Sequence, residues 1–181
     1  NQNLTQDSKS LFKEANLCYK ASAYRAALLF SYIAFQTILK ERILSALVPN
    51  GISEKLWTSI QTDMRDDDKW DKTVFECLMK KSPTQIFQIS EDLRQQLTYW
   101  RYRRNDCAHS KSNIISYSHV ESFWCFIKSN LSKFVVVGSQ ESLTNRIKRH
   151  FDYSYTAPGT PYDSIISEIP HAIERDALQC F

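Results

Sequence analysis

Hydrophobic positions recur along this chain at intervals of three and four residues, the spacing that places side chains on one face of an α-helix. The clearest case begins at Ser116 or Ser118, after which apolar residues follow at steps of 3, 1, 3, 4, 3 and 1. These residues are Val120, Phe123, Trp124, Ile127, Leu131, Phe134 and Val135. A stripe of this width predicts a long helix that faces a hydrophobic core.

Five earlier segments are also expected to be helical, although residues 53–82 are less regular than the others. Helices are expected over residues 7–22, 24–47, 53–60 and 70–81, and from Ser90 onward. Asp7 or Ser8 is expected to cap the first helix. Ser90 is followed by two acids, which lie at the positive end of the helix dipole, as in a capping motif. The core face of the second helix is expected to carry Ala26, Phe30, Ile33, Ala34 and Ile38.

The pattern weakens after Gly138. A basic turn or two is expected over residues 141–150, then an aromatic, turn-rich stretch over 153–161, and a short helix over 163–178 interrupted at Pro170. The whole chain contains only three Gly and five Pro, which favours long helices. We therefore predict an all-α fold, an up-and-down bundle of about four to five main helices with a less regular C-terminal arm.

The predicted domain division follows from this change of pattern. Residues 1–137 are expected to form the helical domain, and residues 138–181 the C-terminal arm. The role of the arm stays open between an autoinhibitory segment, a segment that binds a regulatory protein, a contact to a second protomer, and the start of a linker.

Composition excludes several classes of protein. The five cysteines include no C-x-x-C pair, so neither a zinc site nor a disulfide framework is indicated, and a reducing, cytoplasmic setting is expected. Cys18 and Cys125 fall on apolar stripes and are expected to be buried. No apolar run approaches the length of a membrane span and no secretory leader is visible, so no membrane association is expected. The net charge of +3 is compatible with a polyanionic partner without identifying one.

The charged segment 63–69 contains three adjacent aspartates, and carboxylates of this kind can bind a metal ion. Asp66, Asp67 and Asp68 are adjacent, so their carboxylates cannot all converge on one ion, and the Gly and Glu of a calcium loop are missing. We expect a solvated charged loop there, and no metal.

A cation interrupts the apolar stripe of the helix that starts at Ser90. Leu93, Leu97 and Trp100 follow at steps of four and three, and one more step of four lands on Arg104. A charge on a core-facing stripe must reach solvent or be paired. This is also the densest cationic stretch of the chain, with Arg101, Arg103, Arg104, His109 and Lys111 interleaved with Tyr99, Trp100 and Tyr102.

The spacing of three polar residues in this stretch suggests how they could act together. Asn105 and His109 lie one helical turn apart, so the amide could orient the imidazole. Arg104 and His109 are five residues apart, roughly 140° around a regular helix. Their convergence requires either that the helix ends between them or that a second copy of the chain supplies one of them, which points to a site at a two-fold interface.

An arginine and a histidine suffice for one reaction of RNA. Histidine exchanges protons near neutral pH, and the planar donors of arginine stabilise a charged phosphorane. Together they can promote attack of a ribose 2′-hydroxyl on its own phosphodiester without a metal. The alternative reading is structural, because Arg and His near a helix end also compensate the helix dipole.

The segment Arg104-Asn105-Asp106-Cys107-Ala108-His109 resembles the signature of the HEPN superfamily, an Arg and a His separated by four to six residues with a polar residue often after the Arg. Residues 21–40 resemble the second helix of that family, with small residues interleaved for close packing. The resemblance covers about residues 8–137. It implies a dimer in which the Arg and His residues line a cleft between subunits.

The resemblance also implies a function and roles for residues. We expect a metal-independent endoribonuclease that needs no cofactor, leaves a 2′,3′-cyclic phosphate and acts as a toxin or antiviral defence effector. Arg104 would stabilise the transition state, His109 would act as general acid and base, and Asn105 would orient His109 or the substrate. Flanking substrate contacts would come from Arg101, Tyr102, Arg103 and Lys111. The expected partners are RNA, a second copy of the chain, and an antitoxin or regulatory domain.

Two alternatives remain open at the level of sequence. Some HEPN proteins have lost catalysis and serve as interaction or regulatory modules. In another subgroup a paired nucleotidyltransferase modifies a tyrosine two residues after the His, but this chain has Lys111 there, which argues against that subgroup. The second alternative is an unrelated helical bundle in which Arg104 and His109 are caps.

Overall fold

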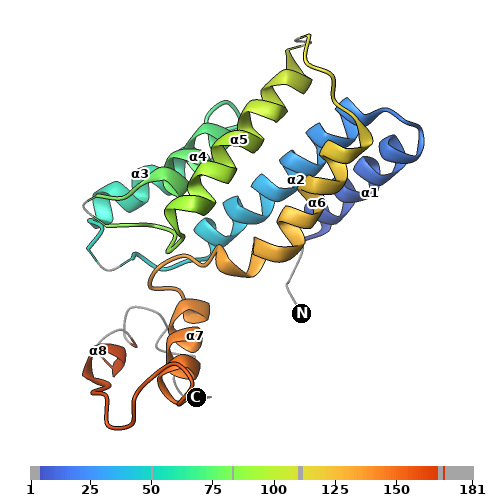
Figure 1. Ribbon diagram of the computed structural model, residues 1–181. Coiled ribbons are helices and arrows are strands. Elements are labelled where there is room, and N and C mark those ends of the chain that lie inside the picture. Colours follow the sequence, from blue (N-terminus) through green and yellow to red (C-terminus); the bar gives the residue numbers. More distant parts are fainter. Residues whose placement is uncertain (1–4, 50, 83, 110–111, 167–168, 170–181) are drawn as a thin grey trace. The chain divides into compact units, whose positions relative to one another are not determined.

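The computed structural model describes residues 5–49, 51–82, 84–109, 112–166 and 169 (Figure 1). These residues form helices joined by turns and loops, so the predicted all-α helical bundle is confirmed. In chain order the elements are α1 (Gln6–Lys20), α2 (Tyr24–Leu44), α3 (Glu54–Arg65), α4 (Trp70–Met79), α5 (Glu91–Ala108), α6 (Tyr117–Asn130), the 3₁₀ turn η1 (Leu131–Lys133), α7 (Gln140–His150) and α8 (Asp163–Ile166).

The chain forms two compact units, each built from two segments. Unit 1 comprises Asn1–Glu41 and Ile89–Phe134, and unit 2 comprises Arg42–Gln88 and Val135–Phe181. The last passage from unit 1 to unit 2 follows Phe134, close to the predicted boundary after residue 137. The prediction divides the chain once, into two consecutive parts. Each compact unit instead combines two segments that are distant in sequence, so the units do not test the predicted division, which stays a prediction.

Unit 1 is a bundle of α1, α2, α5 and α6, with α2 packed against its neighbours on several sides (Figure 1). Ala27, Leu28, Ala34, Phe35 and Leu39 of α2 are all fully buried. A helix that is apolar around most of its circumference has to be enclosed by other elements. The predicted core face was therefore only partly right, because Ala34 and Ile38 are buried whereas the other three are half-buried.

Aromatic rings join three helices in the core of unit 1. Trp100 of α5 lies 4.9 Å from Phe123 of α6, measured between ring centroids, and Phe123 lies 6.0 Å from Phe35 of α2. The indole Nε1 of Trp124 donates a hydrogen bond of 2.8 Å to the Ser31 hydroxyl of α2. Large buried rings dominate core energetics, so this cluster fixes α5 and α6 against α2.

Side-chain caps determine where several helices begin. Thr5 caps α1, accepting from the Ser8 amide, whereas Asp7 or Ser8 had been expected. Ser90 caps α5 as predicted, with its hydroxyl 3.2 Å from the Leu93 amide. Ser116 opens α6 in a capping box in which His119 takes the place that Glu or Gln usually holds.

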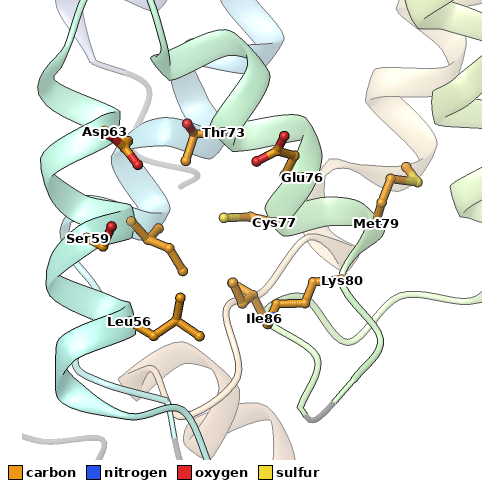
Figure 2. A pocket seen from close by; sticks show the side chains of 10 residues that line it. Leu56, Ser59, Asp63, Thr73, Glu76, Cys77, Met79, Lys80 and Ile86 are labelled. Atoms are coloured by element: carbon orange, nitrogen blue, oxygen red, sulfur yellow. The ribbon is translucent and has the colours of Figure 1, made fainter.

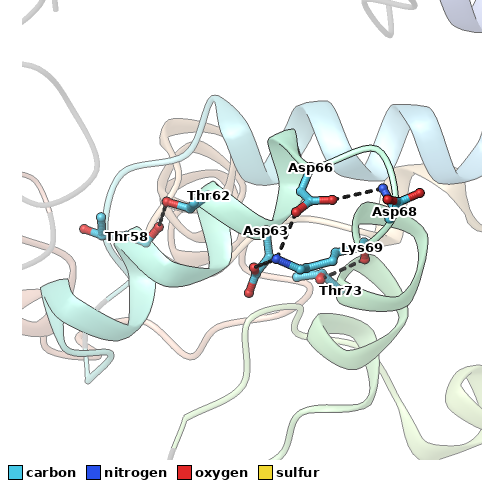
Figure 3. A network of polar contacts seen from close by, with 7 residues as sticks. All are labelled: Thr58, Thr62, Asp63, Asp66, Asp68, Lys69 and Thr73. Atoms are coloured by element: carbon cyan, nitrogen blue, oxygen red, sulfur yellow. Dashed lines mark hydrogen bonds and ion pairs between the residues drawn. The ribbon is translucent and has the colours of Figure 1, made fainter.

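Unit 2 contains the helical hairpin of α3 and α4. The predicted loop over 63–69 was wrong at its start, because α3 continues to Arg65 and Met64 is fully buried. Lys69 then forms ion pairs with Asp66 at 2.9 Å and Asp63 at 3.6 Å (Figure 3). In the part of the chain that the structure describes, no group of His, Cys, Asp and Glu side chains is arranged to hold a metal ion.

The C-terminal segment of unit 2 has a small core of its own. Leu143 of α7 and Ile165 of α8 are buried together, with Ile147 and Ile169 against them. α8 covers the first four residues of the helix predicted over 163–178, and residues 167, 168 and 170–178 lie outside the described residues. An antiparallel backbone bridge joins Phe87 and Val136.

Two further predictions concern burial and membranes. The prediction that the side chains of Cys18 and Cys125 are buried was wrong, because Cys18 is half-buried and Cys125 is exposed. On both helices the buried face is narrower than the apolar stripe in the sequence, and the two cysteines lie outside that buried face. Among the described helices, none is both long enough and apolar enough to cross a bilayer.

Candidate active site

The candidate site lies at the C-terminal end of α5, where the helix leaves the core of unit 1. Leu93, Leu97 and Trp100 are buried, as the apolar stripe predicts. One turn further, Arg104 is half-buried, and Ala108 on the same stripe is exposed. The stripe thus runs out of the core over the last turns of α5, and Arg104 marks the transition.

Arg104 and Asn105 are bonded to each other. The guanidinium Nη1 of Arg104 donates to the amide Oδ1 of Asn105 over 3.1 Å. The described hydrogen bonds do not include one between the Asn105 amide and the His109 imidazole. In this structure Asn105 therefore orients the arginine, and its expected role in orienting His109 remains a prediction.

His109 terminates α5. Its backbone amide donates to the carbonyl of Asn105 over 3.0 Å, and its side chain is exposed. The last helical residue is Ala108, and the bond from the His109 amide to Asn105 continues the helical path as far as His109, so the expected convergence of Arg104 and His109 stays a prediction. The end of one helix thus carries a fixed guanidinium and a solvent-exposed imidazole.

Arg25 of α2 anchors this end of α5, a role that the sequence analysis missed. Its Nη1 donates to the carbonyl of Asp106 over 2.6 Å, and its Nη2 donates to the carbonyl of Asn113 over 2.5 Å. The last carbonyls of a helix have no partner within the helix, so the first bond satisfies one of them. Because Asp106 and Asn113 flank His109, Arg25 holds both ends of the segment that carries the imidazole.

A sequence signal for Arg25 did exist. It is the sole charged residue within residues 21–39, a stretch that otherwise reads as a buried helix. A lone cation in such a stretch calls for a polar partner. The identity of that partner depends on which residues the fold brings near, and spacing along the chain does not provide it.

Asp106 is the buried polar residue of the motif. It is 3% exposed and forms an ion pair of 2.9 Å with Arg103, one turn earlier on α5. The guanidinium of Arg103 also lies over the Tyr99 ring, 5.4 Å from its centroid. Arg103, expected to hold a flanking phosphate, is therefore already engaged within its own helix.

The remaining predicted contact residues differ in accessibility. Tyr102 is 61% exposed and Arg101 is half-buried, so both lie at the surface of α5. Lys111, the last predicted contact, lies outside the described residues. Arg101 and Asn105 lie one turn apart on α5, whereas Tyr102 lies roughly 160° around the helix from Arg104, and His109 follows at the helix end.

The thiol inside the motif is not suited to nucleophilic chemistry. Burial raises the pKa of Cys107 to about 11. A thiol is nucleophilic as the thiolate, and at neutral pH this group is therefore in its unreactive protonated form.

Unit 2 contains a pocket of about 420 Å³ between α3 and α4 (Figure 2). It is lined by Leu56, Ser59, Ile60, Asp63, Thr73, Glu76, Cys77, Met79, Lys80 and Ile86. The Cys77 side chain points into it, and burial raises the pKa of this thiol to about 12. The lining offers no histidine and no reactive thiolate, so the pocket is a weaker candidate for catalysis than the end of α5.

Comparisons with protein-family models, with curated proteins and with solved structures found no match to this chain.

Proposed function

We propose that this protein is a metal-independent endoribonuclease of the HEPN type, acting as a toxin or antiviral defence effector. The observation that carries the proposal is the end of α5, where Arg104 is oriented by Asn105 and the exposed His109 follows directly after the last helical turn. Support also comes from the anchoring of this segment by Arg25, because a preorganised site loses less entropy when it binds substrate.

The proposed reaction is an internal transfer within RNA. The 2′-oxygen of a ribose forms a bond to the adjacent phosphorus, and the bond from phosphorus to the 5′-oxygen breaks. His109 accepts the proton of the 2′-hydroxyl, and the imidazolium that results returns a proton to the departing 5′-oxygen. Arg104 stabilises the negative charge that develops on the phosphorane oxygens. The products are a 2′,3′-cyclic phosphate and a 5′-hydroxyl.

We propose further that two copies of the chain form the complete site. Arg104 and His109 are five residues apart on one helix, and a two-fold dimer would bring Arg104 of one copy to His109 of the other in each of two equivalent sites. Exposed apolar side chains accompany the candidate residues, since Tyr99 is 47%, Tyr102 61% and Ile114 83% exposed. Aromatic residues of this kind are enriched in interfaces between proteins.

The test uses the purified full chain, total RNA and EDTA. Wild type is expected to leave fragments that end in 2′,3′-cyclic phosphate, and a DNA oligonucleotide of the same sequence is expected to stay intact because it lacks the nucleophile. His109→Ala and Arg104→Ala are each expected to reduce cleavage at least about 100-fold. Arg65→Ala is the matched control, because Arg65 is exposed on α3 and bonds within its own helix.

Two results would contradict the proposal. Cleavage that survives in both His109→Ala and Arg104→Ala would remove these residues from the mechanism. Intact RNA with wild-type protein, together with a stable complex with a partner protein, would favour the alternative of a non-catalytic interaction module.

A further inference from the structure

Exposed aromatic rings gather at the C-terminal end of α7 in unit 2. Phe151, Tyr153, Tyr155 and Tyr162 are 70%, 79%, 70% and 57% exposed. Of the eleven large hydrophobic side chains that are exposed among the described residues, five lie within residues 151–166. Single exposed apolar residues are ordinary, whereas a group of them marks a surface that binds something.

The helix that leads into these rings ends in positive charge. Its last turn contains Lys148, Arg149 and His150, and Lys148 and Arg149 are exposed. Asp152 is the one acid between residues 142 and 162, and its carboxylate accepts a hydrogen bond of 2.9 Å from the Ser154 amide. The surface therefore combines aromatic faces with an excess of cations.

Local contacts hold the rings in place. The guanidinium of Arg149 lies 5.5 Å from the Tyr155 ring centroid, and the Thr156 hydroxyl donates to the Arg149 carbonyl over 2.8 Å. The imidazole of His150 lies 5.2 Å from the Phe151 ring at an angle of 89°. The same imidazole lies 6.3 Å from the Tyr162 ring at 81°. The turn after α7 is thus folded back onto the helix end, and the rings of Phe151, Tyr155 and Tyr162 contact its side chains.

We propose that this aromatic–basic surface, formed by residues 148–162, binds a single strand of polynucleotide without regard to sequence. Exposed rings stack on bases of any kind, and neighbouring Lys and Arg side chains neutralise the phosphates between them. A purely apolar partner would leave Lys148 and Arg149 uncompensated. The identification of this strand with RNA substrate rests on the proposed function, whereas the binding itself does not.

The measurement is fluorescence anisotropy of labelled oligothymidylate and oligouridylate of about 15 nucleotides with the full chain. Oligothymidylate lacks the 2′-hydroxyl, so binding to it is read without cleavage. Tyr153→Ala and Tyr155→Ala are each expected to weaken binding by about 5- to 150-fold, and Tyr153→Trp is expected to retain it because the ring face remains. Leu17→Ala, at a residue 66% exposed on α1, is the control for loss of exposed apolar surface.

A second readout tests the cations. Lys148→Ala and Arg149→Ala are each expected to reduce the slope of log affinity against log salt by about 0.7, the value for one contact to a single-stranded phosphate. Failure of wild type to bind either oligonucleotide would overturn the proposal. So would unchanged affinity in the Tyr153→Ala, Tyr155→Ala double variant with its fold retained by circular dichroism.

The outcomes separate this proposal from the ribonuclease proposal. Binding of oligothymidylate that depends on Tyr155, without RNA cleavage by wild type, supports the surface and contradicts the ribonuclease. Cleavage that depends on His109, with unchanged oligothymidylate affinity in the tyrosine variants, supports the ribonuclease proposal and contradicts the binding surface.

Discussion

At the scale of single residues, the violation of a local pattern located the candidate site. Arg104 interrupts an apolar stripe, and the structure shows it half-buried and bonded to Asn105 at the point where α5 leaves the core. The same reasoning could have been applied to Arg25, a lone cation in an apolar helix. Arg25 donates to the backbone on both sides of His109, so it acts on the candidate site through position.

Arg25→Ala is expected to weaken the site and the fold together. The substitution leaves the carbonyls of Asp106 and Asn113 without these two donors, which costs about 1.5 kcal/mol of unfolding free energy. RNA cleavage is expected to fall more than this stability loss explains, because His109 lies in the segment that Arg25 anchors. Urea unfolding and a cleavage assay in EDTA measure both effects. Unchanged stability and activity, matching the Arg65→Ala control, would contradict the proposed anchor.

At the scale of elements, the presence of the main helices was predictable from the sequence, whereas the residues at which they end were less predictable. Ser90 could be predicted as a cap because its hydroxyl accepts a hydrogen bond from the amide of Leu93, only three residues away in the sequence. The end of α3 was missed because charged side chains dominate residues 63–69. Met64 nevertheless continues the spacing of Trp57 and Ile60 and is fully buried within unit 2.

The packing of α4 predicts a pH dependence of stability. Burial raises the pKa of Cys77 from an ordinary value near 9 to about 12. Between these values the folded chain keeps the thiol proton that the unfolded chain releases. The stabilisation is therefore fully present below pH 9 and is lost as the pH rises toward 12, by about 1.4 kcal/mol per pH unit.

Cys77→Ala isolates this contribution. The variant is expected to be less stable than wild type at pH 8, because a buried side chain is truncated, yet to lose stability less steeply above pH 9. Urea unfolding at several pH values between 8 and 10.5 gives both slopes. Identical slopes in the two proteins would show that the Cys77 thiol ionises equally easily in the folded and unfolded chains.

At the scale of the whole molecule, one compact unit carries all the described parts of the candidate active site. Arg25 on α2, Arg104 and Asn105 on α5, and His109 after it all belong to unit 1. The exposed aromatic surface at the end of α7 belongs to unit 2. Binding and cleavage of a strand would therefore be assigned to different units of one chain.

A mixing experiment tests the proposed dimer. If each site takes Arg104 from one copy and His109 from the other, a heterodimer of Arg104→Ala and His109→Ala chains contains one intact site. An equal mixture of the two inactive variants, refolded together, is then expected to recover about a quarter of wild-type cleavage, because half of the dimers carry one of two sites. A mixture that stays inactive while dimers form would mean that each site uses both residues of one copy.

The sequence alone determined the all-α class, the order of the main helices and the residues of the Arg104–His109 motif. These features depend on spacing within a few turns, and the local backbone rules act over the same distances. The tertiary structure alone decided that α2 is enclosed on several sides, that Asp106 is buried, and that Arg25 reaches it across 81 residues of sequence. It also decided which exposed rings gather at the end of α7. Such contacts arise from the packing of whole helices, and periodicity along one helix says nothing about which partner lies opposite it.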